Sequence, residues 1–138
     1  MTYWNPWVYE DEPYFEYDGT SVGFVYIIEN LITQRKYIGK KTFTTYRTKM
    51  IGGKRKKVTT ESDWKTYYGS NDELCRDVEE HGDENFSRTI LRLCKTKGEV
   101  SYYEAFYQFE RNCLISDDYY NSWIAVRIRK SHLRHLFK

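Results

Sequence analysis

Two short apolar segments, each with a tyrosine at one end, constrain the fold of this chain most strongly. The first segment, GFVY, ends at Tyr26, and the second, YIG, begins at Tyr37 and ends at Gly39. The residues between the two tyrosines are typical of the end of one strand, a tight connection and the start of a second strand. We therefore expect both phenols on neighbouring antiparallel strands, where cross-strand side chains meet on one face.

The rest of the chain extends this pair of strands into an α+β domain with the order β-β-α-β-α. We expect a small three-stranded antiparallel sheet flanked by helices, because one short sheet needs helices to cover its apolar face. Three parts follow: an acidic aromatic arm at 1–20, a core domain at 21–124 and a basic tail at 125–138. The first predicted elements are strands at 22–29 and 35–39, followed within 42–63 by a helix fragment and then a mobile basic loop or hairpin. A helix then runs from a Ser70–Glu73 capping box to about Gly82, and a strand follows at 86–94. The chain ends with a helix at 99–114, a closing segment at 119–124 and a basic helix at 125–137.

Length and composition exclude several classes of protein. A chain of 138 residues suffices for one compact domain. It contains neither a long apolar run typical of a membrane helix nor an N-terminal secretory signal, so we expect a cytoplasmic protein that does not enter a membrane. The three cysteines are widely spaced and indicate reduced core thiols, with no zinc site and no disulfide framework. His132 and His135 have no cysteine or carboxylate nearby in sequence, so a metal site there is not indicated.

Charge is distributed unevenly along the chain, although the net charge is only +2. Residues 1–20 contain five acids and no Lys or Arg, residues 35–57 contain ten basic residues and no acid, and the last twelve residues contain five basic residues and no acid. Clustered cations bind phosphates because each neutralised phosphate releases condensed counterions. We therefore expect a nucleic acid as the partner, although solvated loops also produce such runs. The candidate nucleic-acid-binding residues are Lys40, Lys41, Lys54, Arg55, Lys56, Lys57, Arg127, Arg129 and Lys130.

The two tyrosine segments resemble the core motif of the GIY-YIG nuclease superfamily, and the stretches 63–74 and 81–91 resemble the middle of its small, phage-type, homing-endonuclease-like members. The resemblance covers about residues 22–123 and implies a metal-dependent DNA endonuclease located inside the host cell. It assigns catalytic positions to Tyr26, Tyr37, Arg47, Glu104 and Asn121, with Gly39 as the motif glycine and Arg47 at the start of the first helix.

The sequence departs from the family pattern in three places. The first half-motif ends in FVY in place of GIY. Ile51 stands where many members have a histidine or tyrosine, so a helper in proton transfer is either missing or supplied by Tyr46, Lys40 or Lys41. The Gly-Gly-Lys-Arg-Lys-Lys insertion has no fixed place in the pattern, and Arg55 could replace Arg47 in the site.

The family implies hydrolysis with one metal ion, Mg²⁺ or Mn²⁺, held by Glu104. Glu104 lies among aromatic residues, where a carboxylate is costly unless it is paired or bound to metal. Glu110 is a competing carboxylate that points elsewhere on the same helix. In this scheme Tyr26, by preference, orients and helps deprotonate the attacking water, Tyr37 positions the phosphate or water, and Arg47 stabilises the transition-state charge.

Each of these residues also has an ordinary structural role to weigh against the catalytic one. Tyrosines favour strands, Gly39 suits a turn, and Asn121 suits the bend after Asp117-Asp118. Two other functions remain open: a nucleic-acid-binding or regulatory protein with little or no cleavage activity, and an interaction protein whose acidic arm docks a partner or covers its own basic groove.

Overall fold

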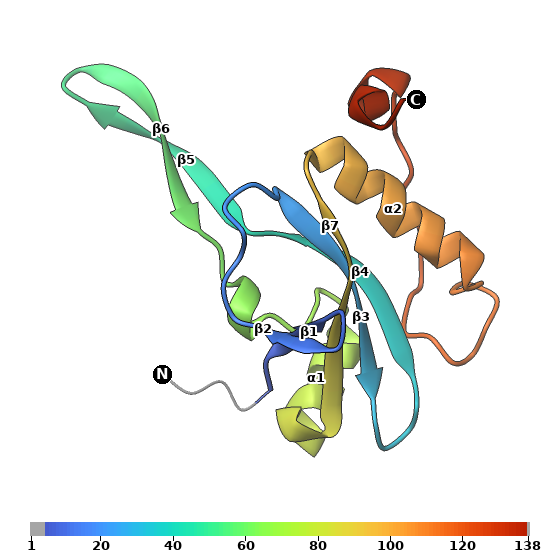
Figure 1. Ribbon diagram of the computed structural model, residues 1–138. Coiled ribbons are helices and arrows are strands. Elements are labelled where there is room, and N and C mark those ends of the chain that lie inside the picture. The colour runs from blue at the N-terminus through green and yellow to red at the C-terminus, as the bar shows by residue number, and fades with distance from the viewer. Residues whose placement is uncertain (1–4, 138) are drawn as a thin grey trace.

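Strand β3 (Gly23–Asn30) lies inside a five-stranded sheet that organises the molecule (Figure 1). The structure is a computed structural model that describes residues 5–137; residues 1–4 of the predicted arm and Lys138 of the predicted tail lie outside the described residues. The strand order is β2-β1-β7-β3-β4. The other strands of this sheet are β1 (Trp7–Tyr9), β2 (Glu12–Tyr14), β4 (Lys36–Thr42) and β7 (Phe86–Cys94).

The predicted α+β class is confirmed, but the prediction of three antiparallel strands is wrong. The arm supplies the two additional strands: β1 pairs with β2 in antiparallel fashion and with β7 in parallel, with Val8 opposite Thr89. The sheet is therefore mixed. Residues 7–14 are an integral part of it, because the Trp7 side chain is only 1% exposed and its Nε1 donates to the Trp64 carbonyl oxygen at 2.6 Å.

Two cores lie on opposite faces of the sheet, because side chains alternate along β3. Phe24, Tyr26 and Ile28 point into a largely aromatic core, which also contains Leu74 from helix α1 (Asp72–His81). Val25 points to the other face, where it packs with Val100 of helix α2 (Lys97–Glu110). Burial on both faces explains why β3 is apolar along most of its length.

The two helices begin and end close to the predicted positions, but their capping residues differ. Asn71 caps α1 by accepting from the Leu74 backbone N–H at 2.9 Å, so the predicted Ser70–Glu73 capping box is not formed. Gly82 ends this helix with a φ of +88°. Thr96 caps α2 by accepting from the Glu99 N–H at 3.0 Å.

Residues 42–63 contain no helix fragment. They form a second, two-stranded sheet, here called the basic ribbon, of β5 (Thr44–Ile51) and β6 (Lys54–Glu61), which projects from the body (Figure 1). The turn is Gly52-Gly53, both with positive φ, as a two-residue hairpin turn requires. Three short 3₁₀ helices complete the described chain: η1 (Trp64–Thr66), η2 (Asp83–Asn85) and η3 (Lys130–Leu136).

The predicted helix at 125–137 is reduced to η3, since residues 125–129 have no regular structure. Cys94 and Cys113 are buried thiols as expected, whereas Cys75 is exposed. Within residues 5–137 no helix is both long and apolar enough to cross a membrane.

We expect Trp7→Ala to lower the free energy of unfolding by about 3–5 kcal/mol, because it removes a fully buried aromatic side chain and leaves a cavity. Urea denaturation followed by circular dichroism would measure this loss. Phe15→Ala is the matched control: Phe15 is exposed, so its effect should stay within about 0.5 kcal/mol. A loss for Trp7→Ala as small as that expected for the control would show that this part of the arm does not stabilise the domain.

Candidate active site

Tyr26 and Tyr37 lie on one face of the β3–β4 hairpin, as the sequence predicts. Tyr26 is opposite Gly39 and Tyr37 is opposite Ile28, so the two tyrosines are diagonal neighbours. Their ring centroids are 6.2 Å apart. A Cβ atom on residue 39 would lie 2.5 Å from the Tyr26 hydroxyl, so only glycine lets this ring lie across β4.

Glu104 lies in the middle of α2 and faces the same cavity as the two tyrosines. The cavity has a volume of about 240 Å³, enough for several water molecules. Among the described residues that line it, Glu104 is the only acid and Lys40 the only cation. The full lining is Tyr26, Tyr37, Lys40, Ser70, Asn71, Glu104, Gln108, Asn121, Ser122, Trp123 and Ala125.

The Glu104 carboxylate is largely buried, with 15% of the side chain exposed. Burial raises its pKa, and the Lys40 ammonium, with Nζ 3.8 Å from Oε1, opposes this rise. Lys40 also donates to Ser101 Oγ at 3.0 Å, one helical turn before Glu104. A desolvated carboxylate beside a single half-exposed cation can still accept a stronger positive charge.

Both tyrosines are unfavourable sites for a negative charge in the free protein. Burial raises the pKa of Tyr26 well above 10, with further increases from Tyr67 and Tyr37. Burial also raises the pKa of Tyr37, although its hydroxyl lies 3.5 Å from Ser70 Oγ, a contact that lowers the pKa. The phenols are therefore hydrogen-bond donors at neutral pH unless additional positive charge approaches them.

Asn121 lines the cavity, but both polar atoms of its side chain bind the backbone of β4. Its Oδ1 accepts from the Ile38 N–H at 3.0 Å and its Nδ2 donates to the Ile38 carbonyl oxygen at 2.8 Å. Gln108 Nε2 donates to the same carbonyl at 3.0 Å. Asn121 thus replaces a neighbouring strand at the edge of the sheet and fixes the segment that carries Tyr37 and Gly39.

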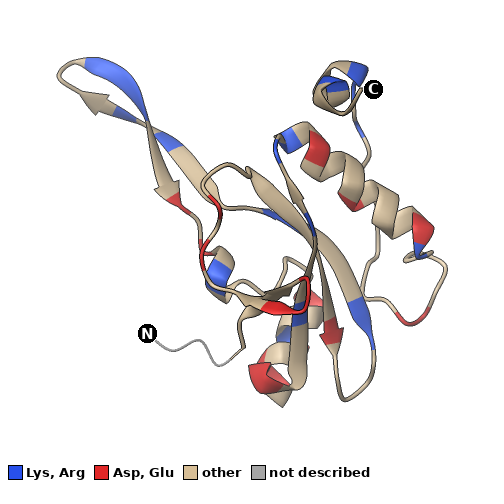
Figure 2. Cartoon of the chain, in the orientation of Figure 1, with Lys and Arg blue, Asp and Glu red and all other residues tan. Residues whose placement is uncertain are grey.

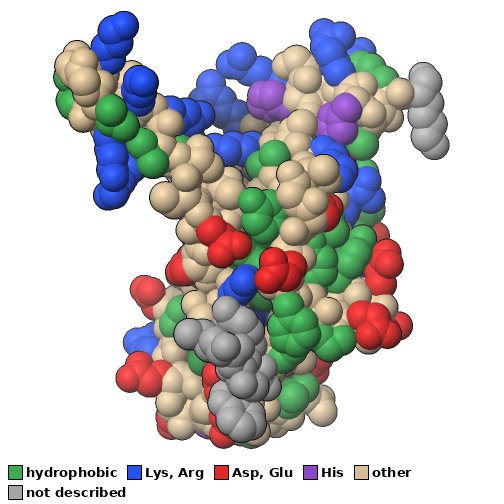
Figure 3. Space-filling view, turned by 60° about the vertical axis from the view of Figure 1, so that its left-hand side comes forward, with side chains coloured by type: hydrophobic (Ala, Val, Ile, Leu, Met, Phe, Trp, Pro, Cys, Tyr) green, Lys and Arg blue, Asp and Glu red, His purple; other side chains and the backbone are tan. Residues whose placement is uncertain are grey.

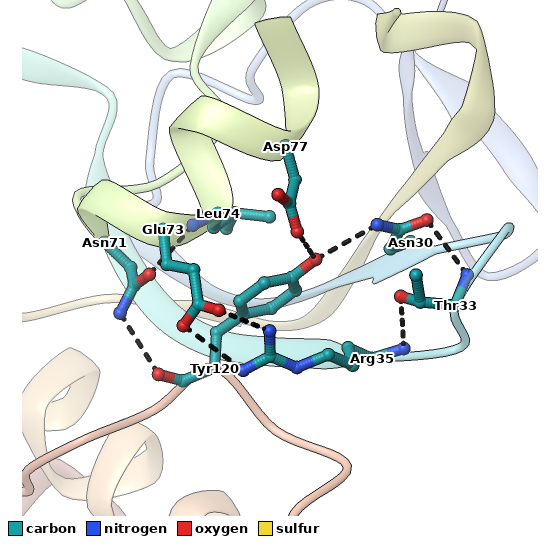
Figure 4. A network of polar contacts seen from close by, with 8 residues as sticks. All are labelled: Asn30, Thr33, Arg35, Asn71, Glu73, Leu74, Asp77 and Tyr120. Carbon is teal, nitrogen blue, oxygen red and sulfur yellow. Dashed lines mark hydrogen bonds and ion pairs between the residues drawn. The ribbon is translucent and has the colours of Figure 1, made fainter. Parts of the chain in front are cut away.

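A polar network centred on Tyr120 holds this segment against α1 (Figure 4). The Tyr120 hydroxyl donates to Asp77 at 2.6 Å and accepts from Asn30 Nδ2 at 3.0 Å, while the Tyr120 carbonyl oxygen accepts from Asn71 Nδ2 at 3.1 Å. Arg35 lies over the Tyr120 ring and pairs with Glu73 at 2.6 Å. The network connects the turn after β3, the start of α1 and the residue next to Asn121.

Comparisons with known proteins identify the family to which this fold and its two motif tyrosines belong. A family model described as "Putative endonuclease segE, GIY-YIG domain" matches residues 7–124. This chain belongs to the GIY-YIG nuclease family. Over 81 residues it is 35% identical to the "Putative endonuclease segE" of Enterobacteria phage T4, a match that covers 59% of this chain and 31% of that protein. No solved structure matches the chain.

Arg47 is placed differently from the family expectation. It lies in the middle of exposed strand β5, opposite Val58, and not at the start of a helix. It does not line the cavity, and neither does Arg55 near the ribbon tip. The helix fragment predicted within 42–63 is therefore wrong, whereas the hairpin predicted as an alternative for its second part is the structure that forms, as the Gly-Gly pair between alternating residues indicates.

Lys40 and Lys41, predicted together as DNA contacts, occupy different environments. Lys40 faces the cavity, whereas Lys41 pairs with Asp63 at 2.6 Å and lies over the Tyr67 ring at 4.0 Å. The tail cations Arg127, Arg129 and Lys130 lie outside the cavity. The sequence did not identify Ser70, Asn71 and Gln108 as residues of the cavity. Its only indications were that Ser70 and Asn71 lie at the start of α1 and that Gln108 lies on α2, the helix that carries Glu104.

We expect Glu104→Gln to raise the melting temperature at pH 7 when EDTA is present. The raised pKa of Glu104 means that the folded state binds this proton more tightly than the unfolded state. This contribution to stability is complete below the ordinary value of 4.5 and is lost as the pH rises through the folded pKa. The advantage of the neutral variant should therefore disappear below about pH 4.5. A variant that melts below the wild type at pH 7 would contradict this expectation.

Proposed function

We propose that this GIY-YIG nuclease domain is a divalent-metal-dependent endonuclease that hydrolyses phosphodiester bonds of DNA. The observation that carries the proposal is the shared cavity: one largely buried carboxylate from α2 faces the two motif tyrosines from β3 and β4. The "Putative endonuclease segE" of phage T4 supports the same reaction class by its printed name.

The residues of the cavity fit a hard cation. Mg²⁺ and Mn²⁺ prefer carboxylate oxygens and Mg²⁺ retains several waters, so one protein carboxylate suffices. Glu104 would hold the ion, and its desolvation favours a partner of higher charge than the Lys40 ammonium. When bound, the ion would polarise the scissile phosphate and lower the pKa of an attacking water.

Tyr26 and Tyr37 differ in burial, and we therefore assign them different roles. Tyr26 is 1% exposed and its pKa is raised well above 10, so we assign it to donate a hydrogen bond that orients the water or a phosphate oxygen. Tyr37 is partly exposed to the cavity and is the better acceptor of a proton. For this step the Tyr37 phenol would first have to lose its own proton, and because its pKa is raised this requires additional positive charge nearby, which a cation held by Glu104 would supply.

Lys40 takes the role that the resemblance gives to Arg47. It is the cation of the cavity, and an ammonium group can neutralise charge that develops on the phosphate oxygens. Asn121 and Gln108 act as positioning residues, since their hydrogen bonds to Ile38 fix the strand that carries Tyr37 and Lys40.

The distribution of charge supports a DNA substrate. Lys and Arg gather on the basic ribbon and on the C-terminal segment, whereas Asp and Glu lie mainly on the arm, α1 and α2 (Figure 2). In the space-filling view most blue side chains lie at the upper end of the molecule and the red ones lie lower (Figure 3). A molecule with one basic end approaches a polyanion with that end forward. We propose that the ribbon lysines and the tail cations Arg127, Arg129 and Lys130 contact phosphates on either side of the cut.

Nicking of supercoiled plasmid would test the proposal. The wild type should nick with Mg²⁺ or Mn²⁺ and stop in EDTA, and Glu104→Gln should be at least about a hundredfold slower because the metal ligand is lost. Glu110→Gln is the matched control, since Glu110 is exposed on the same helix outside the cavity. Equal rates for the wild type and Glu104→Gln would instead favour a DNA-binding protein on this fold.

A second comparison separates Lys40 from Arg47. We expect Lys40→Gln to lower the single-turnover nicking rate at saturating protein by about ten- to a hundredfold, because the cavity loses its cation. Arg47→Gln should leave this rate within about twofold of the wild type, because Arg47 lies on the exposed ribbon. The reverse pattern would show that the ribbon folds over the cavity to deliver Arg47 during the reaction.

A further inference from the structure

The basic ribbon is built as an independent projection. Within the part of the chain that the structure describes, strands β5 and β6 pair only with each other, and nearly all their residues are exposed. A two-stranded hairpin is marginally stable when it packs on nothing else. A partner that covers the ribbon would therefore contribute to its order.

The charges of the ribbon are unbalanced in the free protein. Its six cations are Arg47, Lys49, Lys54, Arg55, Lys56 and Lys57. Its only acid, Glu61, is the last residue of β6, and none of the six cations forms an ion pair within residues 5–137. Lys49 lies directly opposite Lys56. Like charges in this position destabilise a hairpin, so the ribbon is arranged for an external anion.

Four of these cations share one face of the ribbon. Residues paired across the two strands point to the same side, so this face, here called the Arg47 face, carries Arg47, Lys49, Lys54 and Lys56. Successive cations on one strand are about 7 Å apart, the axial rise of about two base pairs. Each strand has eight residues, which span about 27 Å or roughly eight base pairs.

These dimensions match one groove of one kind of nucleic acid. The major groove of B-form DNA is about 12 Å wide and admits a two-stranded β-ribbon, whereas its minor groove is about half as wide. The major groove of A-form RNA is deep and narrow and excludes such an element. Ile51 and Val58 lie among the cations on the Arg47 face, and beyond Arg47, toward the base of the ribbon, this face presents the methyl and hydroxyl groups of Thr45 and Thr60, which can contact base edges.

We infer that the basic ribbon lies in the major groove of duplex B-form DNA with its Arg47 face toward the bases. This inference rests on the proposed function, since it names the form of DNA that the enzyme takes. The cations contact the phosphates that flank the groove, and the threonines lie against its floor.

The opposite face of the ribbon contacts helix α2, which carries the active-site residue Glu104. The Tyr46 ring lies under two ammonium groups, with Lys57 Nζ at 3.7 Å and Lys97 Nζ at 5.1 Å from its centroid. Lys97 is the first residue of α2, the helix that carries Glu104. The ribbon therefore docks at a set distance from the cavity, and the cut falls at a fixed offset from the groove that it occupies.

Binding of full-length protein to a 30-base-pair DNA duplex would test the inference. All variants carry Glu104→Gln and EDTA is present, so that no cleavage occurs. For Lys49→Gln/Lys56→Gln we expect the slope of log Kd against log salt to fall by about 2. The control, Arg76→Gln/Arg111→Gln, removes the same charge from exposed sites outside the ribbon and should leave the slope unchanged. Equal slopes for the two pairs would overturn the inference.

Groove-specific competitors decide between the two grooves. A bulky substituent on the 5-position of every cytosine, which fills the major groove, should weaken binding at least about tenfold. Saturation of the minor groove with netropsin should change the affinity by less than about twofold. An RNA duplex of the same sequence should compete poorly. Displacement by netropsin together with tolerance of the cytosine substituents would overturn the inference.

The two proposals fail in different ways. If the Glu104→Gln protein binds in the major groove but the wild type nicks no DNA with any metal, the catalytic proposal fails and the ribbon inference stands. If the wild type nicks plasmid while Lys49→Gln/Lys56→Gln binds with unchanged affinity and salt slope, the ribbon inference fails and the nuclease stands.

Discussion

The ring of Tyr26 occupies the space that a side chain on residue 39 would fill, and the active site depends on this close approach. Gly39 lies opposite Tyr26 in the hairpin, and its missing Cβ lets the phenol cross β4 toward the edge of the sheet. Glu104 reaches the same edge from the helix on the opposite face. The cavity thus forms where residues from both faces of one sheet meet, which requires β4 to be an edge strand.

The environment of Glu104 disfavours its charge, and this is the carboxylate that we propose as the metal ligand. A largely buried carboxylate beside one half-exposed ammonium has a raised pKa, and the folded protein would be more stable with a neutral group. Such local conflicts are expected where a site is built for function. The surrounding aromatic core supplies the compensation, since Trp7, Trp64, Phe43 and Phe24 pack in edge-to-face or tilted contacts close to Tyr26.

The sequence predicted the local elements well and the non-local ones poorly. The β3–β4 hairpin and β7 follow from alternation and turn residues, and the meeting of Tyr26, Tyr37 and Glu104 in one cavity follows from the family motif. The parallel pairing of Val8 with Thr89 joins residues 81 apart and leaves no local signal. The hydrogen bonds of Asn121 to Ile38 are equally non-local. The position of Arg47 at the start of a helix followed from the family motif alone, and the structure places it on strand β5 of the hairpin that turns at Gly52-Gly53.

Both borders of the main sheet carry features that hinder pairing with a further strand. Along β4, residues 118–121 bind backbone groups at the outer edge of the strand. The Lys36 N–H donates to the Asp118 carbonyl oxygen, and the Tyr120 N–H donates to the Lys36 carbonyl oxygen. The side-chain amide of Asn121 binds both the N–H and the carbonyl oxygen of Ile38. At the opposite border, β2 is three residues long and contains Pro13 and the acidic Glu12. Short, charged or proline-containing borders prevent sheets from joining end to end into fibres. Asn121, which lines the candidate cavity, therefore also occupies backbone groups of β4 with which a second chain could pair.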